Sequence, residues 1–404
     1  MTAIPTVGAA GPAPASEATP PRAGDHRGSW IPNWRLITTR LMELRKRRGL
    51  MIAMIVVIIG IPTIFLVVRL ISHAVDPKSY GPAGGYSIYT SLVAGVMYVF
   101  GFIMAATLGC TAGSSDLTEG MFRHLVVTGR SRLALYLARI PAGLAIVWSL
   151  MAVGFLIVCA VCVFAAPTQL NYDGATVPVG LSQSGLEAWA ANHAELVICD
   201  FNYNGPEKVG LACGPNGPIP NGPPAVIQTQ KGPGAVVGPG FGGGSVKKAT
   251  PSEIKAAAVM IARQNYADYA DTFLTPSSSL MVRSGLWLEL EATIGFVVGL
   301  GLASLLGQRT VAVILVIVLE IILTPIISTH VIPHFINAER GVVGLATDHL
   351  EPAGLPLQFH GGGGGGPGAA LLVPESKEVA IIVIVVWLVG WTILGAWRMM
   401  TRDA

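Results

Sequence analysis

Charged side chains are scarce in this 404-residue chain: Asp, Glu, Lys and Arg make up only 12% of it, while 52% of its residues are hydrophobic. Soluble domains carry about 25% charged residues, so the composition argues against two or three ordinary soluble domains and indicates a membrane protein. The positive mean hydropathy of +0.60 agrees with that interpretation. The net charge of +3 says little by itself; what matters is where the basic residues lie.

Motifs for catalysis and metal binding are missing as well. The chain has no GxxxxGK[ST] stretch to cradle phosphates, no HExxH, no GxSxG and no paired Cys/His spacing for a metal. We therefore expect no catalytic residue, no metal site and no cofactor in this chain. Any work that it does must draw on a gradient or on a partner.

Cysteine is also rare, with five residues. Cys199 and Cys213 fall in a region that the charge pattern places outside the cell, where a disulfide is permitted, and the sequence leaves open whether the two pair. Cys159 and Cys162 have the CxxC spacing of a redox or zinc pair, but they lie in an apolar run with no further ligand nearby. We interpret that pair as membrane-buried thiols.

Long apolar runs are what the chain has in abundance. The run LMIAMIVVIIGIPTIFLVV between Arg48 and Arg69 is uncharged, and its roughly 19 residues, at about 1.5 Å each, can cross a hydrocarbon core about 30 Å thick. Only helices or closed barrels satisfy the backbone in lipid, and these runs lack the alternation of barrel strands. The sequence therefore predicts an all-α membrane protein with six transmembrane helices, at about 50–69, 87–109, 136–166, 286–306, 309–330 and 378–397.

The distribution of Lys and Arg sets the expected orientation. The first run begins about fifty residues into the chain and has no small-residue cleavage site, so it is not a signal peptide. Basic residues cluster in alternate segments, namely Arg40, Arg45, Lys46, Arg47, Arg48, Arg123, Arg130, Arg132, Arg309, Arg398 and Arg402. The positive-inside rule makes these segments and both termini cytoplasmic. A nucleic-acid patch at 45–48 is the alternative, but the position beside a span explains the charge, and we expect no nucleic-acid partner.

The segments before the first span differ in composition. Residues 1–34 are rich in Pro, Ala and Gly and are expected to form a disordered cytoplasmic tail. Residues 35–49 mix leucine and isoleucine with basic side chains, which favours an amphipathic helix on the inner membrane surface over a soluble docking helix. The membrane part then comprises 50–166, 286–330 and 378–404.

Between the third and fourth predicted spans, residues 167–285 are expected to form a large extracytoplasmic insertion. Its stretch GPNGPIPNGPPAVIQTQKGPGAVVGPGFGGGS predicts a flexible linker that is neither helix nor regular strand. Thr250, Pro251 and Ser252 form a start signal before strong helix formers, which predicts a helix at about 252–273. The outer loop 331–377 holds a second glycine-rich run after His360, which we interpret as a linker because one histidine lacks co-ligands.

Ionisable residues within spans are candidates for function because they are costly in lipid. Glu320 lies near the middle of the fifth predicted span. It either faces a translocation path or is held protonated or hydrogen-bonded for packing, and the sequence does not decide between the two. Glu289 and Glu291 lie beside Trp287, which favours solvation at the outer interface. Arg139 is near the inner end of the third span, where its side chain can snorkel to water.

The stretch SSDLTEGMFRHLVVTGRSR, residues 114–132, is a charged segment between two apolar runs. Asp116 and Glu119 have the spacing of a capping box, and Glu119 and Arg123 form a favourable i,i+4 pair. These signals predict a short cytoplasmic helix at 116–127, followed by a break at Gly129 and a new start at Ser131. Its apolar stripe needs a partner and consists of Leu117, Met121, Phe122, Leu125 and Val126.

A six-span chain with such a helix between spans two and three resembles the membrane permease subunit of the ABC-2 class of ABC transporters. Glu119 and Gly120 match an acidic-glycine motif in that family's loop, and TGRSR at 128–132 matches its T-P-x-S-R element except that Gly129 replaces proline. GLGLASLLGQRTVAVILVIVLEIILTPII is similar to the family's fourth and fifth spans, VIPHFINAERGVVGLATDHLEPAGL to its last outer segment, and AWRMMTRDA to its R-R-D ending. The long region 167–285 departs from the family, whose loop there is usually short.

The resemblance implies partners and a site. In that family the loop helix inserts into a groove of a separate ABC ATPase subunit, which binds ATP and Mg²⁺. The coupling residues would be Asp116, Leu117, Glu119, Gly120, Met121, Phe122 and Arg123. One six-span set is half a transporter, so a second permease copy, identical or paralogous, is implied in a bacterial plasma membrane. The expected activity is ATP-driven export of a hydrophobic or amphipathic substrate.

Two other functions stay open at this point. One is a gradient-driven transporter in which Glu320 carries a proton. The other is a membrane-anchored scaffold or sensor whose outer region 167–285 binds a ligand or a cell-wall component.

Overall fold

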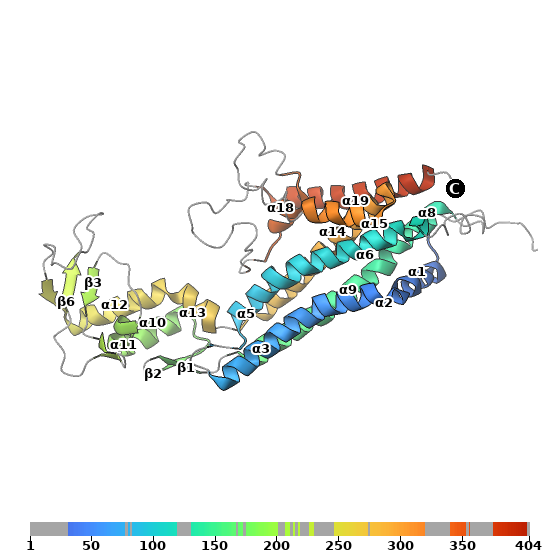
Figure 1. Ribbon diagram of the computed structural model, residues 1–404. Coiled ribbons are helices and arrows are strands. Elements are labelled where there is room, and N and C mark those ends of the chain that lie inside the picture. Colours follow the sequence, from blue (N-terminus) through green and yellow to red (C-terminus); the bar gives the residue numbers. More distant parts are fainter. Residues whose placement is uncertain are drawn as a thin grey trace, which may run out of the picture.

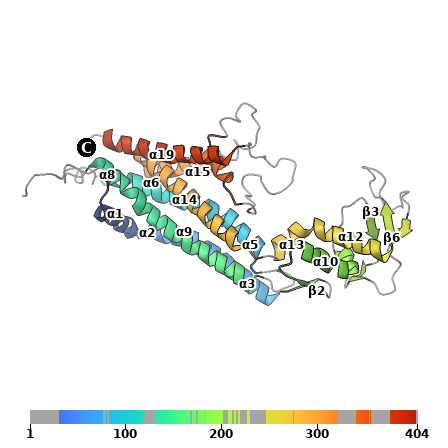
Figure 2. The same ribbon diagram turned by 180° about the vertical axis from the view of Figure 1, so that it is seen from behind.

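The structure is a computed structural model. It describes the chain except for residues 1–30, 77–79, 81–82, 119–130, 167–168, 173–174, 201–206, 211–212, 215–216, 219–225, 230–245, 274, 320–339, 353–354, 356–374 and 402–404. Long helices form an elongated bundle, and a smaller module of helices and short strands projects from one end of it (Figure 1). We call that end the α5 end and the opposite one, where α1, α8 and the end of α19 lie, the α8 end (Figure 2).

Five described helical stretches are long and apolar enough to cross a membrane: Arg48–Val75, Tyr86–Ser115, Arg132–Phe164, Ser278–Leu306 and Lys377–Thr401. They are built from α2 (Arg48–Ile55), the π-helical turn η1 (Val56–Gly60), α3 (Ile61–Val75), α5 (Tyr86–Thr90), η2 (Ser91–Met97), α6 (Tyr98–Thr118), α8 (Arg132–Leu137), α9 (Arg139–Phe164), α14 (Ser278–Leu306) and α19 (Lys377–Thr401). The predicted helical membrane architecture is confirmed in this form.

The predicted span at 309–330 is described only in its first part. Helix α15 (Arg309–Ile317) begins it, and most of the remainder lies outside the described residues. The number of six spans therefore stays a prediction.

Glycine brings α6 and α14 into close contact at the centre of the bundle. A Cβ atom added at Gly113 would lie 2.6 Å from the carbonyl oxygen of Leu300, and one at Gly295 would lie 2.9 Å from that of Phe102. Each helix carries the small-xxx-small spacing that lets membrane helices approach backbone to backbone. The four glycines are Gly109, Gly113, Gly295 and Gly299.

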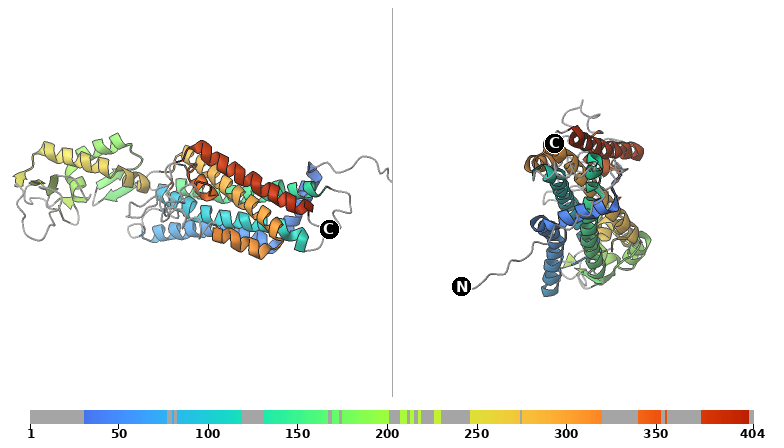
Figure 3. Two further views of the ribbon diagram at one scale, coloured as in Figure 1. Left: turned by 90° about the horizontal axis from the view of Figure 1, so that it is seen from above. Right: turned by 90° about the vertical axis from the view of Figure 1, so that its right-hand side faces the viewer.

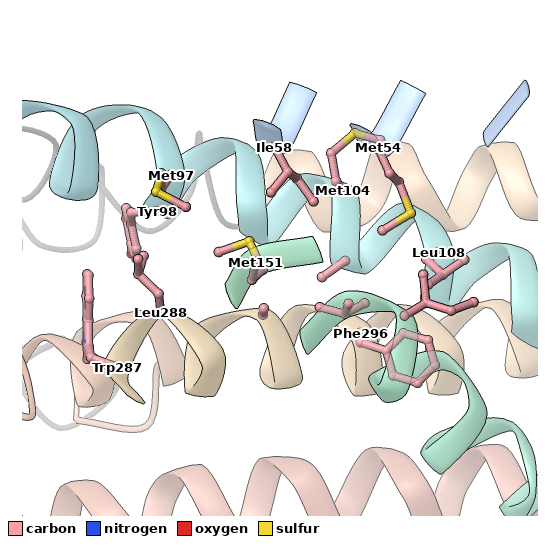
Figure 4. Packing of buried hydrophobic residues seen from close by; sticks show 14 of the residues in the cluster. Met54, Ile58, Met97, Tyr98, Met104, Leu108, Met151, Trp287, Leu288 and Phe296 are labelled. Atoms are coloured by element: carbon pink, nitrogen blue, oxygen red, sulfur yellow. The ribbon is translucent and has the colours of Figure 1, made fainter. Parts of the chain in front are cut away.

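Methionine side chains fill the space between α9 and the second span (Figure 4). Met151 of α9 packs over Gly101, where an added Cβ would lie 2.7 Å from the methyl carbon of Met151. Met97 of η2 packs near Gly154, where an added Cβ would lie 3.4 Å from the methyl carbon of Met97. Both methionines are almost fully buried. Their flexible thioethers suit the irregular gaps that glycine leaves.

The π-helical turn in the first span has a local cause. Pro62 has no N–H to donate to the carbonyl of Ile58, four residues earlier. That carbonyl faces α9 at Gly154, where an added Cβ would lie 2.8 Å from it. The irregular backbone is thus covered by protein, as membrane-spanning helices require.

Helix α1 (Trp34–Lys46) confirms that residues 35–49 are largely helical. It packs beside α9, and its Leu36 lies against α8 and Ala138; Arg47 is the single residue between α1 and α2. Figure 3 shows it at the α8 end of the bundle. Its expected place on a membrane surface stays a prediction.

The module inserted between α9 and α14 has its own small core. Its helices are α10 (Gln183–Asn192), α11 (Ala194–Asp200), α12 (Pro251–Gln264) and α13 (Tyr266–Phe273). The core consists of Leu186, Ala190, Ala194, Val197, Ala258, Ile261, Ala262 and Tyr269. Helix α13 contacts α5, which joins the module to the bundle. Part of the predicted insertion is therefore folded.

The predicted helix at 252–273 is confirmed with one break. Thr250 caps α12 in a reciprocal capping box with Glu253, as the start signal indicated. The chain then turns at Asn265 before α13 begins.

Short strands correct the all-α description and the linker prediction. Strand β6 (Val226–Thr229) lies inside the glycine-rich stretch and pairs antiparallel with β3 (Glu207–Gly210) and β7 (Val246–Lys248). The apolar-polar run VIQT between prolines and glycines suffices for one strand when two partners flank it. The other strands are β1 (Gln169–Tyr172), β2 (Ala175–Pro178), β4 (Cys213–Gly214) and β5 (Gly217–Pro218).

Candidate functional site at the α8 end of the bundle

Most sequence-predicted site residues lie outside the described residues. These are Glu119, Gly120, Met121, Phe122, Arg123 and Glu320. Cys199 falls at the end of α11 and Cys213 in β4, but neither side chain is described. Their pairing therefore stays open, whereas Cys110, Cys159 and Cys162 are free thiols.

The predicted helix start at Asp116 is corrected by the structure. Asp116 and Leu117 lie in the last turn of α6, which continues without a break to Thr118. The physical reason is that Gly113, Ser114 and Ser115 stay packed inside the bundle, so the helix of the second span keeps its shape beyond the apolar run. The start predicted at Ser131 is confirmed, because its hydroxyl accepts a hydrogen bond from the N–H of Ala134 at 3.0 Å and caps α8.

Arg139 is the central polar group of this end. Among the described residues it is the largest fully buried side chain, with 2% of its surface exposed. Its Nη1 donates a hydrogen bond to the carbonyl oxygen of Gly113 at 3.2 Å. The expected snorkelling to water is therefore wrong: the guanidinium points into the bundle, because Gly113 leaves a carbonyl within its reach.

Ser304 brings α14 to the same carbonyl. Its hydroxyl donates to Leu300 of its own helix at 2.7 Å and lies 3.5 Å from the Gly113 oxygen. One backbone oxygen at the end of α6 is thus shared by side chains from α9 and α14. A cation is costly in such surroundings, so its presence points to a function.

Tyr136 extends this group of residues to α19. Its side chain is fully buried, and a Cβ atom added at Gly395 would lie 2.8 Å from the ring carbon that bears the hydroxyl and 3.1 Å from the Cα of Gly301. The phenol therefore fits against α19 only because position 395 is glycine. On the surface, Arg132 donates to the carbonyl of Met400 at 3.2 Å.

These contacts make a joint, which we define as Gly113, Tyr136, Arg139, Ser304 and Gly395. It connects the short helix α8 with α6, α9, α14 and α19. The segment 119–130 runs from the end of α6 to the start of α8, so Gly113 lies before it on α6 and Tyr136 follows it on α8.

The α5 end carries a second set of polar contacts. Helix α18 (Val343–Asp348) is buried, and Trp287 of α14 donates from Nε1 to the carbonyl of Thr347 at 3.2 Å. Trp387 of α19 donates in the same way to Gly341 at 2.8 Å. The two tryptophans thereby hold the segment 341–348 against the bundle.

Carboxyl groups occur at the end of this segment and near Trp287 on α14. Glu291 is 2% exposed, so the expected solvation at an interface is wrong for this residue; it lies one helical turn after Trp287 on the packed face of α14. Glu289 is only partly buried. Asp348 is buried, and the half-buried Glu351 has a pKa raised to about 8 because burial disfavours its charged form. Among the described residues, no group of three or more His, Cys, Asp or Glu is arranged to hold a metal ion.

Comparison of the chain with family models, with curated proteins and with solved structures finds no match.

Proposed function

We propose that this chain is the permease subunit of an ABC transporter of the ABC-2 class and moves a hydrophobic or amphipathic substrate out of a bacterial cell. The observation that carries the proposal is the hydrogen bond from Arg139 to Gly113, which joins α9 to α6 on either side of the segment 119–130. A buried cation within a helix bundle is costly and is therefore a candidate for function.

In this proposal the α8 end is cytoplasmic, and the segment 119–130 docks on a separate ATPase subunit through Glu119 and Phe122. The ATPase binds ATP and Mg²⁺. Its closure pushes on the segment, and the joint passes the displacement to α6, α14 and α19. Two such chains, identical or paralogous, form one transporter, and Glu320 lies along the path of the substrate. ATP shifts the helices between two arrangements only if the docking contacts differ in the two states.

Purification of the tagged full-length chain from its own cells in mild detergent, followed by mass spectrometry, tests the proposal. We expect a soluble protein with Walker motifs in a 1:1 ratio. The variants Glu119→Gln and Phe122→Ala should lose it, while Arg283→Gln, at an exposed residue of the α5 end, should keep it. A chain that emerges alone from several detergents and after cross-linking would contradict the assignment.

A second candidate function rests on the inserted module. Its separate core shows that the region is more than a linker, which favours a membrane-anchored receptor that binds a ligand outside the cell. This function needs no ATPase. Deleting 183–273 should then abolish ligand binding, whereas Phe122→Ala should leave ligand binding unchanged.

A further inference from the structure

Helix α1 has two opposite faces. Leu36, Arg40 and Leu44 recur every four residues and are buried. Leu36 packs against Ala134, Leu135 and Ala138, at the junction of α8 and α9. This face is fully used by contacts within the chain.

The opposite face is exposed and basic. At 100° per residue its side chains cover an arc of about 140°. They are Trp34, Arg35, Thr39, Met42, Arg45 and Lys46. Trp34 is 72% exposed and Met42 is 55% exposed, so large apolar side chains alternate with three cations.

No acidic side chain offsets this charge within α1. Its one carboxylate, Glu43, pairs with the buried Arg40 at 2.6 Å. None of Arg35, Arg45 or Lys46 forms a salt bridge with another described residue. The face therefore attracts negative charge that the described residues do not supply.

The position of α1 selects the source of that charge. Only Arg47 separates α1 from α2, and the exposed Arg48 opens the first stretch that is long and apolar enough to cross a membrane. The C-terminal end of α1 is thus one residue from the start of that stretch, where a membrane span would meet the headgroup layer. At this level a lipid bilayer presents phosphate groups above an apolar layer.

We propose that the exposed face of α1 binds the headgroups of anionic phospholipids in the leaflet next to the α8 end. Arg35, Arg45, Lys46 and Arg48 contact the phosphates, while Trp34 and Met42 insert between the headgroups. Each basic residue near an anionic surface is worth about 1 kcal/mol, so the four together strengthen lipid binding by up to roughly a thousandfold. The proposal does not depend on the ABC assignment.

Native mass spectrometry of the purified full-length chain titrated with phosphatidylglycerol or phosphatidylcholine tests this. We expect tighter phosphatidylglycerol binding that weakens with salt. The variant R35Q/R45Q/K46Q/R48Q should lose the difference between the two lipids. A control that removes four exposed charges elsewhere, K248Q/K255Q/R283Q/K377Q, should keep it, and so should R35K/R45K/R48K.

A second measurement needs no charge variant. In nanodiscs with headgroup-proximal brominated lipids, the fluorescence difference between wild type and Trp34→Phe reports Trp34 alone. We expect brominated phosphatidylglycerol to quench it more strongly than brominated phosphatidylcholine. Equal lipid binding by the Gln variant and the control, or an unquenched Trp34, would overturn the proposal and leave an acidic protein surface as the partner.

Discussion

The guanidinium of Arg139, in the first turn of α9, donates a hydrogen bond to the carbonyl oxygen of Gly113, near the end of α6, over 3.2 Å. The two residues lie 26 positions apart, on either side of the segment 119–130. Because Arg139 is buried, water cannot replace this donor if it is removed. The bond therefore holds the last turns of α6 against the first turn of α9.

Replacing Arg139 with methionine should loosen the end of α6 without unfolding the bundle. Methionine keeps much of the side-chain volume, while a hydrogen bond from a charged donor contributes about 1.5–3 kcal/mol. Hydrogen exchange of the amides at 113–118 should speed up by about tenfold or more, and that of 98–108 should not change. The exposed Arg283→Gln variant should exchange like wild type. If the amides at 113–118 exchanged as slowly in Arg139→Met as in wild type, that result would contradict the role of the joint.

Replacing Gly299 with alanine should push α6 and α14 apart. The added Cβ atom would overlap the carbonyl of Ala106, and backbone atoms cannot move aside as a side-chain tip can. We expect a loss of about 1–3 kcal/mol in stability, seen as a lower thermal unfolding midpoint in detergent. Gly390→Ala is the matched control, because nothing lies within 4 Å of its added Cβ. Equal midpoints for the two variants would show that the contact of α6 with α14 is not this tight.

The helices of the bundle could be predicted because their cause is local. Uncharged runs of about 20 residues predict membrane spans, and Thr250 and Ser131 were recognisable as helix caps from the sequence alone. The end of α6 could not be placed, since Asp116 and Glu119 resemble a start signal while packing further back along α6 holds the helix together.

The joint could not be predicted from the sequence, because it depends on contacts between helices that lie far apart along the chain. From its position near the end of a predicted span, the Arg139 side chain is expected to reach water. Only the fold brings the carbonyl of Gly113 within its reach. One signal was available: the GxxxG spacings of Gly109 with Gly113 and of Gly295 with Gly299 indicate a close helix pair. No sequence pattern links Tyr136 to Gly395, which lies more than 250 positions away.

Tyr136 and Gly395 should be energetically coupled. Gly395→Ala places a Cβ atom against the phenol of Tyr136 and should lower the thermal unfolding midpoint. Tyr136→Leu shortens the side chain and makes room, so the double variant should recover part of the loss. A double-mutant cycle should give a coupling of about 0.5–3 kcal/mol. If the effects of the two variants simply add, the phenol does not pack against Gly395.

The pH dependence of stability should report on Glu351. Burial raises its pKa from the ordinary value of 4.5 to about 8, so the folded chain holds a proton that the unfolded chain releases. The contribution of this proton to stability is complete below about pH 4.5 and is lost as the pH rises toward 8. The thermal unfolding midpoint of wild type should therefore fall more steeply between pH 5 and pH 8 than that of Glu351→Gln, which cannot ionise. The exposed Glu195→Gln variant on α11 should follow wild type. If Glu351→Gln kept the full slope, the carboxyl group would be in contact with water, and the segment 341–351 would not be held against the bundle by Trp287 and Trp387.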